Sequence, residues 1–98
     1  MDKEQAIGIV KKYKEAISDL FETADVYLYG SYSKGTAHPE SDIDVAVIVP
    51  QLEGDWLKLS TRLWVIAPKI DLHIEPVLME KDEPSPLYRD VMRTGIAV

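Results

Sequence analysis

The sequence predicts an α/β (α+β) fold in which a small mixed β-sheet is flanked by helices. Segments with apolar residues at helical spacing alternate with short apolar runs, in the order helix, strand, short helix, strand, helix, strand, helix. The connections between them are short, and the chain contains no repeat or low-complexity segment. Since a chain of 98 residues normally forms one core, we expect a single domain over residues 1–98.

Two longer segments have the periodicity of amphipathic helices. In the first, the apolar positions are Ala6, Ile7, Val10, Tyr13, Ile17 and Leu20. In the second, which runs from Asp55 to Ala67, they are Trp56, Leu59, Leu63 and Ile66. Pro68 is expected to end this helix, because proline has no backbone N–H. We interpret the two tryptophans as core or partner-facing residues, since they lie in an amphipathic pattern.

A glycine-bounded turn follows the first predicted strand. Val26–Tyr29 has the β-branched and aromatic residues of a strand, and Gly30 and Ser31 would end it and begin a short helix. The Ser31 hydroxyl and the free amides of a helix start can hold phosphate oxygens. Gly35 would let the chain leave the turn close to a ligand. Lys34 is either a solvated loop lysine or a contact to a triphosphate.

Two carboxylates follow the turn at the start of a buried strand. Asp42 and Asp44 open the apolar run Val45–Val49. Alternate side chains of a strand share a face, so both carboxylates would point the same way while Ile43 packs on the other face. Two like charges this close are relieved by a proton or a cation. Mg²⁺ suits such a pair and would neutralise charge on a transferred phosphorus group.

A third carboxylate is expected from the next strand. Asp71 lies in the segment Lys69–Glu75, whose alternation predicts a strand. It is the expected additional ligand of a two-metal site and would help to deprotonate an attacking hydroxyl. His73 and Glu75 would share its face and border the site. Glu75 is the alternative carboxylate, but its place beside Pro76 at the expected strand end favours Asp71.

These residues together form a signature: Gly-Ser, three residues, Gly, a short loop, Ser-Asp-x-Asp, and a later strand aspartate. The matching residues are Gly30, Ser31, Gly35, Ser41, Asp42, Asp44 and Asp71. The signature resembles the minimal nucleotidyltransferases of the polymerase-beta-like superfamily, and the resemblance covers nearly the whole chain. The tail Tyr88–Val98 looks like the closing helix and Gly-apolar end of that family. The resemblance implies the polymerase-beta-like nucleotidyltransferase fold.

The resemblance also implies an activity, which is the transfer of a nucleoside monophosphate, with ATP as the expected donor, to an acceptor hydroxyl. The residues expected to bind the nucleotide are Gly30, Ser31, Lys34, Gly35 and Ser41. The residues expected to be catalytic and to hold two Mg²⁺ ions are Asp42, Asp44 and Asp71. Many such small proteins resemble the antitoxin of a pair with a helical HEPN-type toxin, where AMP is added to a tyrosine of the toxin.

Other functions and roles stay open. One is a non-catalytic binding module that neutralises a partner protein, although a pure binder has no reason to keep carboxylates crowded together. Another is transfer to a small molecule of the aminoglycoside type, for which a second copy or a partner would have to supply the missing wall. Tyr32 is either an exposed aromatic residue or a modification target. His38 is either an exposed turn histidine or a contact to phosphate or base.

Composition limits the compartment and the partners. The net charge of −6 and the pI near 4.8 argue against a nucleic-acid partner, because phosphate backbones attract basic surfaces. The absence of cysteine excludes disulfides and thiolate metal sites, and is compatible with the cytoplasm, where we expect the protein. No stretch approaches a membrane span, so no membrane contact is expected. The sequence leaves open whether the chain forms homo- or hetero-oligomers.

Overall fold

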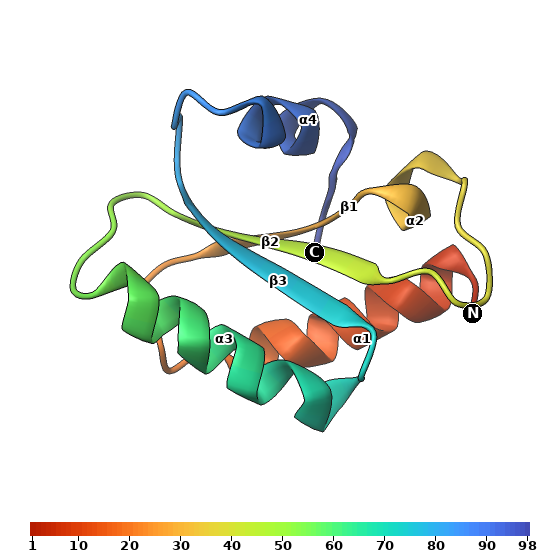
Figure 1. Ribbon diagram of the computed structural model, residues 1–98, viewed down its shortest axis with the longest axis horizontal. Coiled ribbons are helices and arrows are strands. Elements are labelled where there is room, and N and C mark those ends of the chain that lie inside the picture. Colours follow the sequence, from red (N-terminus) through yellow and green to blue (C-terminus); the bar gives the residue numbers. More distant parts are fainter.

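One mixed sheet organises the computed structural model, which describes residues 1–98 (Figure 1). Its strand order is β3-β2-β1-β4. The strand β1 (Asp25–Tyr29) runs antiparallel to both β2 (Ile43–Val49) and β4 (Ile96–Ala97). The strand β3 (Ile74–Glu80) runs parallel to β2 and forms one edge. The mixed sheet expected from the sequence is therefore confirmed.

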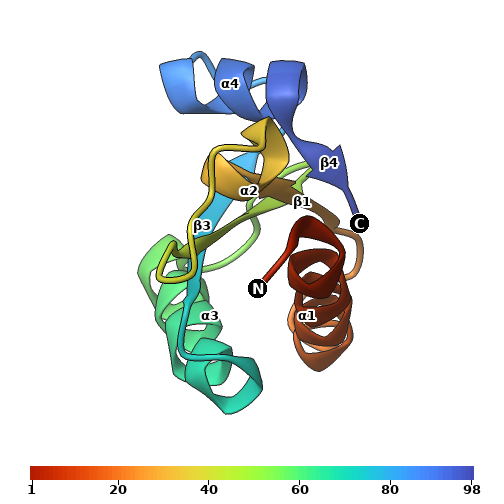
Figure 2. The same ribbon diagram turned by 90° about the vertical axis from the view of Figure 1, so that its right-hand side faces the viewer.

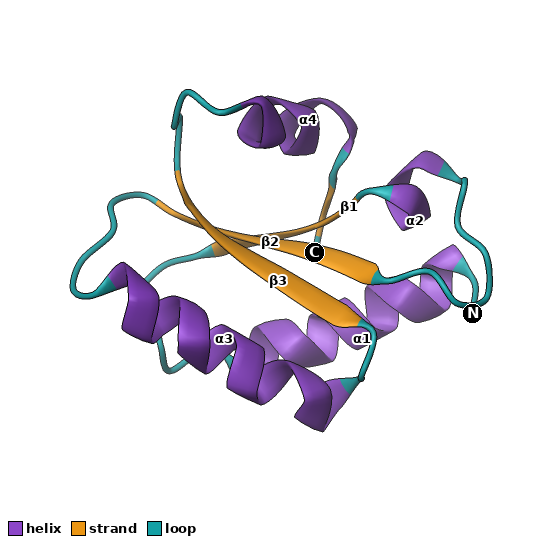
Figure 3. Ribbon diagram, in the orientation of Figure 1, coloured by secondary structure: helices purple, strands orange, loops and turns teal.

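Helices cover both faces of this sheet, as Figures 2 and 3 show. Two long helices, α1 (Lys3–Ala16) and α3 (Trp56–Ile70), lie on one face. The helix α4 (Pro86–Thr94) lies on the opposite face. The short helix α2 (Ser31–Lys34) follows directly after β1. No helix is both long enough and apolar enough to cross a bilayer.

The side chains of β2 alternate between two apolar clusters. The larger cluster contains Ile43 and Val45 of β2 together with residues of α1 and α3. The smaller cluster contains Ala46 and Ile48, which pack with residues of α4. Since alternate residues share a face, Asp44 points to the α4 side of the sheet. Ile43 is fully buried on the other side, as the sequence predicted.

Each of the three longer helices begins at a side-chain cap. Asp2 and Gln5 form a reciprocal capping box at the start of α1. Asp55 accepts hydrogen bonds from two backbone amides at the start of α3. Ser85 caps α4, whose first residue is Pro86, a position where the missing proline N–H costs nothing. The helix starts are thus fixed by local sequence.

Three expectations for the end of α3 and for β3 are wrong. Pro68 does not end the helix, which continues to Ile70; it lies in the last turn, so only two helical residues follow the lost hydrogen bond. The strand predicted over 69–75 begins only at Ile74, and Leu72 lies in the preceding turn with 84% of its surface exposed. Pro76 does not end the strand either. It is tolerated inside β3 because β3 is an edge strand.

Candidate functional site

Three polar side chains lie in one row across the sheet. Tyr29 on β1 is paired with Asp44 on β2, and Asp44 is paired with Glu75 on β3. Paired residues on neighbouring strands point to the same face, which here is the α4 face. Asp42, two residues before Asp44, precedes the same end of β2. The sheet therefore gathers three carboxylates and a tyrosine at one end of one face.

The turn after β1 is packed directly against this row. Gly30 has φ +75° and ψ −146°, a conformation that residues with a Cβ rarely adopt. A Cβ at this position would collide with the Oδ2 atom of Asp44. Gly30 is thus required twice, once for its backbone conformation and once for the space that the carboxylate occupies.

The start of α2 offers free backbone donors beside the carboxylates. The amides of Ser31, Tyr32 and Ser33 have no backbone acceptor, because they form the first turn of a helix with no side-chain cap. Such amides form a ready anion site. Gly35 ends the helix in the left-handed conformation, with φ +75°, and its amide donates to the Ser31 carbonyl. Its role is conformational, since no other atom lies near the position of a Cβ.

The carboxylates raise one another's pKa. Burial, then the charges of Glu75 and Asp42, raise the pKa of Asp44 to about 6. Loss of hydration raises the pKa of Glu75 as well, followed by the charge of Asp42 and a hydrogen bond with it. Glu75 is largely exposed, so its loss of hydration is only partial. No three acidic or histidine side chains are close enough together to enclose a metal ion. The carboxylates interact through their charges without converging on one point.

A second set of residues closes the site from the α4 side. Tyr29 is 8% exposed, and burial, followed by the charges of Asp44, Glu75 and Asp90, raises the pKa of its hydroxyl to about 12. Lys34 pairs with Asp90 of α4 at 3.2 Å (Nζ to Oδ2). The sequence does not predict Tyr29 or Asp90 as site residues. No local motif marks them, because strand pairing and helix packing bring them to the site.

The structure places Asp71 away from the predicted position. It ends α3 instead of lying on a strand, and its Oδ1 accepts a hydrogen bond from the amide of His73 at 2.8 Å. The same oxygen lies 2.8 Å from Nδ1 of the His73 ring. Asp71 therefore organises the turn between α3 and β3. The third carboxylate of the row is Glu75, which the sequence favours less than Asp71.

Three other predicted residues have structural roles. The Ser41 hydroxyl accepts a hydrogen bond from the His38 amide at 2.9 Å, and the Ser41 amide donates to the His38 carbonyl at 2.9 Å. These two bonds hold the loop that leads into Asp42. Tyr32 is 2% exposed, so it is a core residue and not an exposed aromatic residue.

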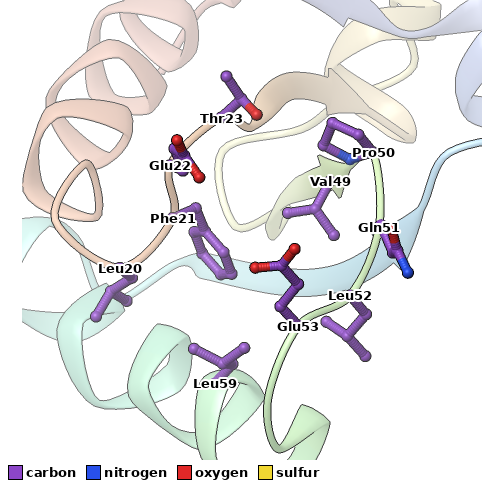
Figure 4. A pocket seen from close by; sticks show the side chains of 10 residues that line it. All are labelled: Leu20, Phe21, Glu22, Thr23, Val49, Pro50, Gln51, Leu52, Glu53 and Leu59. Carbon is purple, nitrogen blue, oxygen red and sulfur yellow. The ribbon is translucent and has the colours of Figure 1, made fainter.

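A separate pocket lies at the far end of β2 from the carboxylates. Figure 4 shows Phe21 and Leu59 among its lining residues, together with Glu22 and Glu53. Val49, the last residue of β2, also lines it. None of its lining residues is basic. A pocket with two carboxylates and no cation does not suit a triphosphate, so the carboxylate row remains the candidate site.

The sequence matches known proteins along most of its length. A family model described as a nucleotidyltransferase domain matches residues 10–96. A protein of Methanocaldococcus jannaschii named "Putative protein adenylyltransferase MJ0141" is 30% identical over 100 residues, which cover 96% of this chain and 99% of that protein. The protein adenylyltransferase MntA of Shewanella oneidensis is 49% identical over 45 residues, which cover 46% of this chain and 29% of MntA.

The fold also matches solved structures. A crystal structure from Sulfolobus solfataricus has a TM-score of 0.69 over 97% of this chain and 80% of that chain, at 14% identity, and shows the fold alone. A toxin–antitoxin structure with AMP-PNP has a TM-score of 0.58 over 99% of this chain and 72% of that chain, at 25% identity. An MntA–HpeT variant with a tyrosine replaced by alanine has a TM-score of 0.60 over 90% and 69%, at 27% identity.

Proposed function

We propose that this chain, which belongs to the nucleotidyltransferase domain family, transfers AMP from ATP to a hydroxyl group of a partner protein. Two of its relatives carry the name of protein adenylyltransferase, which supports a protein as the acceptor. The observation that carries the proposal is the contact of Gly30 with the Asp44 carboxylate. It sets a turn able to bind phosphate against a row of carboxylates able to act in phosphoryl chemistry.

The residues of the site have different roles in the proposed reaction. The acceptor oxygen forms a bond to the α-phosphorus while the bond to the leaving pyrophosphate breaks, and the acceptor proton moves to a carboxylate. Glu75 is the proposed base, because it is exposed on the edge strand and its raised pKa makes it more basic than an ordinary carboxylate. The Ser31 hydroxyl and the free amides of α2 bind phosphate oxygens. Lys34 supports them with its charge.

The donor set of the row fits Mg²⁺. Carboxylate oxygens are the ligands that Mg²⁺ prefers. Burial is the main cause of the raised pKa of Asp44, and the charges of Glu75 and Asp42 add to it; a cation would relieve this charge repulsion. Asp42 and Asp44 would hold Mg²⁺, since one or two carboxylates suffice for this ion, with two ions proposed as the family resemblance implies. When bound, Mg²⁺ supplies positive charge that stabilises the transferred phosphorus group. Asp71 has no part in this proposal, because its carboxylate is engaged in the turn after α3.

The proposed acceptor is a tyrosine of a helical HEPN-type toxin, and the proposed role is that of its antitoxin. The support is that two solved relatives are toxin–antitoxin structures, one of which contains AMP-PNP. The other is a variant in which a tyrosine is replaced by alanine. ATP as the donor agrees with AMP-PNP in the relative.

The test uses the purified chain with the protein encoded beside it. With α-³²P-labelled ATP and Mg²⁺ the partner should become labelled, whereas γ-³²P-labelled ATP should leave it unlabelled. Asp42→Asn and Asp44→Asn should each abolish the label, while Asp71→Asn should retain it. Transfer of the γ-label would indicate a kinase and refute the proposal.

The same variants separate catalysis from simple binding. If the chain acts by transfer, Asp44→Asn protein should form the complex but leave the toxic activity of the partner intact. If Asp44→Asn protein neutralises the partner as well as the wild type does, the chain is a binding module and the transferase proposal is wrong.

A further inference from the structure

We propose that the outward face of α3 is a docking surface for a protein partner whose apolar face is edged with carboxylates. The surface, called here the α3 surface, consists of exposed apolar residues along one side of the helix and in the turn after it. They are Leu57, Trp64, Val65 and Leu72, with exposed fractions of 66%, 49%, 52% and 84%. Within α3, the spacing of seven and one residues puts Leu57, Trp64 and Val65 in a stripe on one side of the helix, and Leu72 follows in the turn after it.

This stripe is additional to the apolar face that α3 needs for folding. The buried residues of the helix, Leu63 and Ala67, pack into the larger cluster beneath the sheet. The α3 surface lies on the other side of the helix and contributes nothing to that core. Contiguous exposed apolar side chains on a small protein mark an interaction site more often than isolated ones do. Tryptophan is also the residue type most enriched at the centres of protein interfaces.

The charges beside the stripe identify the chemistry of the partner. Lys58, Arg62 and Lys69 are the only charged side chains of α3, and their spacing of four and seven residues forms a row along one edge of the stripe. All three are exposed, and none forms an ion pair in the structure. An unpaired basic row in a chain of net charge −6 is complementary to an acidic edge on a partner.

A protein fits this surface better than a membrane or a second copy. The basic residues lie along one edge of the stripe only, and the acidic remainder of the chain would repel an anionic bilayer. A second copy meeting α3 through α3 would bring a second basic row and no carboxylate. An amphipathic helix with leucines on one face and glutamates on one edge would complement both the apolar stripe and the basic row.

Both tryptophans of the chain belong to α3, but only Trp64 lies in the α3 surface, so its fluorescence reports on this surface. Replacing Trp56→Phe leaves Trp64 as the single reporter. The probe is a synthetic helix of about five turns with a leucine stripe and glutamates along one edge; its control has lysines in place of the glutamates. The acidic probe should shift the Trp64 emission to shorter wavelength and bind at least about tenfold more tightly than the basic one.

Two variants test the two features separately. Val65→Ser should weaken binding of the acidic probe, whereas Met92→Ser, at an exposed methionine of α4, should not. Lys58→Glu with Arg62→Glu should reverse the preference, so that the basic probe binds more tightly. Circular dichroism melts of each variant verify that these exposed substitutions leave the fold intact.

Three results would overturn the proposal. One is equal binding of the acidic and basic probes, or binding that survives Val65→Ser. Another is a Trp64 shift with phosphatidylglycerol vesicles and none with the acidic probe, which would assign the surface to a membrane. The third is a shift that rises with protein concentration when no probe is present, which would assign it to self-association. None of these readouts depends on nucleotide transfer.

Discussion

Replacing Gly30→Ala should damage both stability and activity, and the structure allows the two causes to be separated. Gly30 lies in a region of backbone conformation that is almost confined to glycine, where strain costs roughly 1–3 kcal/mol. The added Cβ would also displace the Asp44 carboxylate, and overpacking of this kind costs about 1–3 kcal/mol more. The expected loss in the free energy of unfolding is therefore about 2–6 kcal/mol.

Gly35→Ala is the matched control. Gly35 has the same φ of +75° but lies in the ordinary left-handed region, and no neighbouring atom would meet its Cβ. Its replacement should cost only about 1–2 kcal/mol. For a domain of this size, 1 kcal/mol corresponds to a change in Tm of roughly 4–8 °C. Gly30→Ala should thus lower Tm by at least about 8 °C, and by more than Gly35→Ala does under the same conditions.

Urea unfolding followed by circular dichroism measures the two free energies, and α-³²P transfer below both melting temperatures measures activity. Gly30→Ala should lose transfer even where it is folded, because the turn and the carboxylate can no longer occupy their present positions. Gly35→Ala should keep most of the transfer activity. Equal destabilisation by the two variants would contradict the close approach of Gly30 and Asp44, and full transfer by Gly30→Ala would refute its role in the site.

Three further predictions concern the carboxylates and the α4 side of the site. Glu75→Gln should reduce transfer by about 10²–10⁴-fold while Asp71→Asn leaves it within a few-fold of wild type, as steady-state labelling rates would reveal; the opposite ranking would restore Asp71 as the third carboxylate. The pKa of Asp44 is about 6 in the folded protein, against an ordinary value of 3.8. Asp44 therefore makes its full contribution to the stability of the fold below pH 3.8, and this contribution is lost as the pH rises through 6. Without metal, Asp44→Asn should therefore be more stable than wild type at pH 8 by about 1–2 kcal/mol, after allowance for solvent screening, and the gain should vanish near pH 3.5; a pH-independent difference in urea unfolding would contradict this. Lys34→Met should raise KM for ATP several-fold with little change in Tm, since its pairing with Asp90 is exposed; an unchanged KM would remove Lys34 from the nucleotide site.

The sequence alone predicts the place of a residue in the fold where that place depends on its neighbours in the chain. Gly30 and Ser31 mark the change from strand to helix because one adopts positive φ and the other begins a helix, and both requirements are local. Asp42 and Asp44 could be placed on one face because a strand alternates its side chains. The order of the helices and strands followed from the same periodicities.

The wrong start predicted for β3, which placed Asp71 on a strand, has a physical origin. Ile70, Leu72 and Ile74 alternate as they would in a strand, but Ile70 belongs to the last turn of α3 and Leu72 to an exposed turn. Only the parallel pairing of β3 with β2 sets Glu75 opposite Asp44, and this pairing joins segments about thirty residues apart. Periodicity within one segment contains no information about such a register.

The sheet separates the proposed chemistry from the proposed docking. Asp44 and Glu75 point to the α4 face, while Trp64 and Val65 point away from the opposite face, beyond the body of α3. Substitutions at well-separated sites act additively. Val65→Ser should consequently change how tightly a partner binds without changing how fast a saturating acceptor is labelled, and Asp44→Asn should do the reverse. A protein partner that binds the α3 surface leaves the carboxylate row of the same copy uncovered. That row can therefore act on a tyrosine of a second partner molecule.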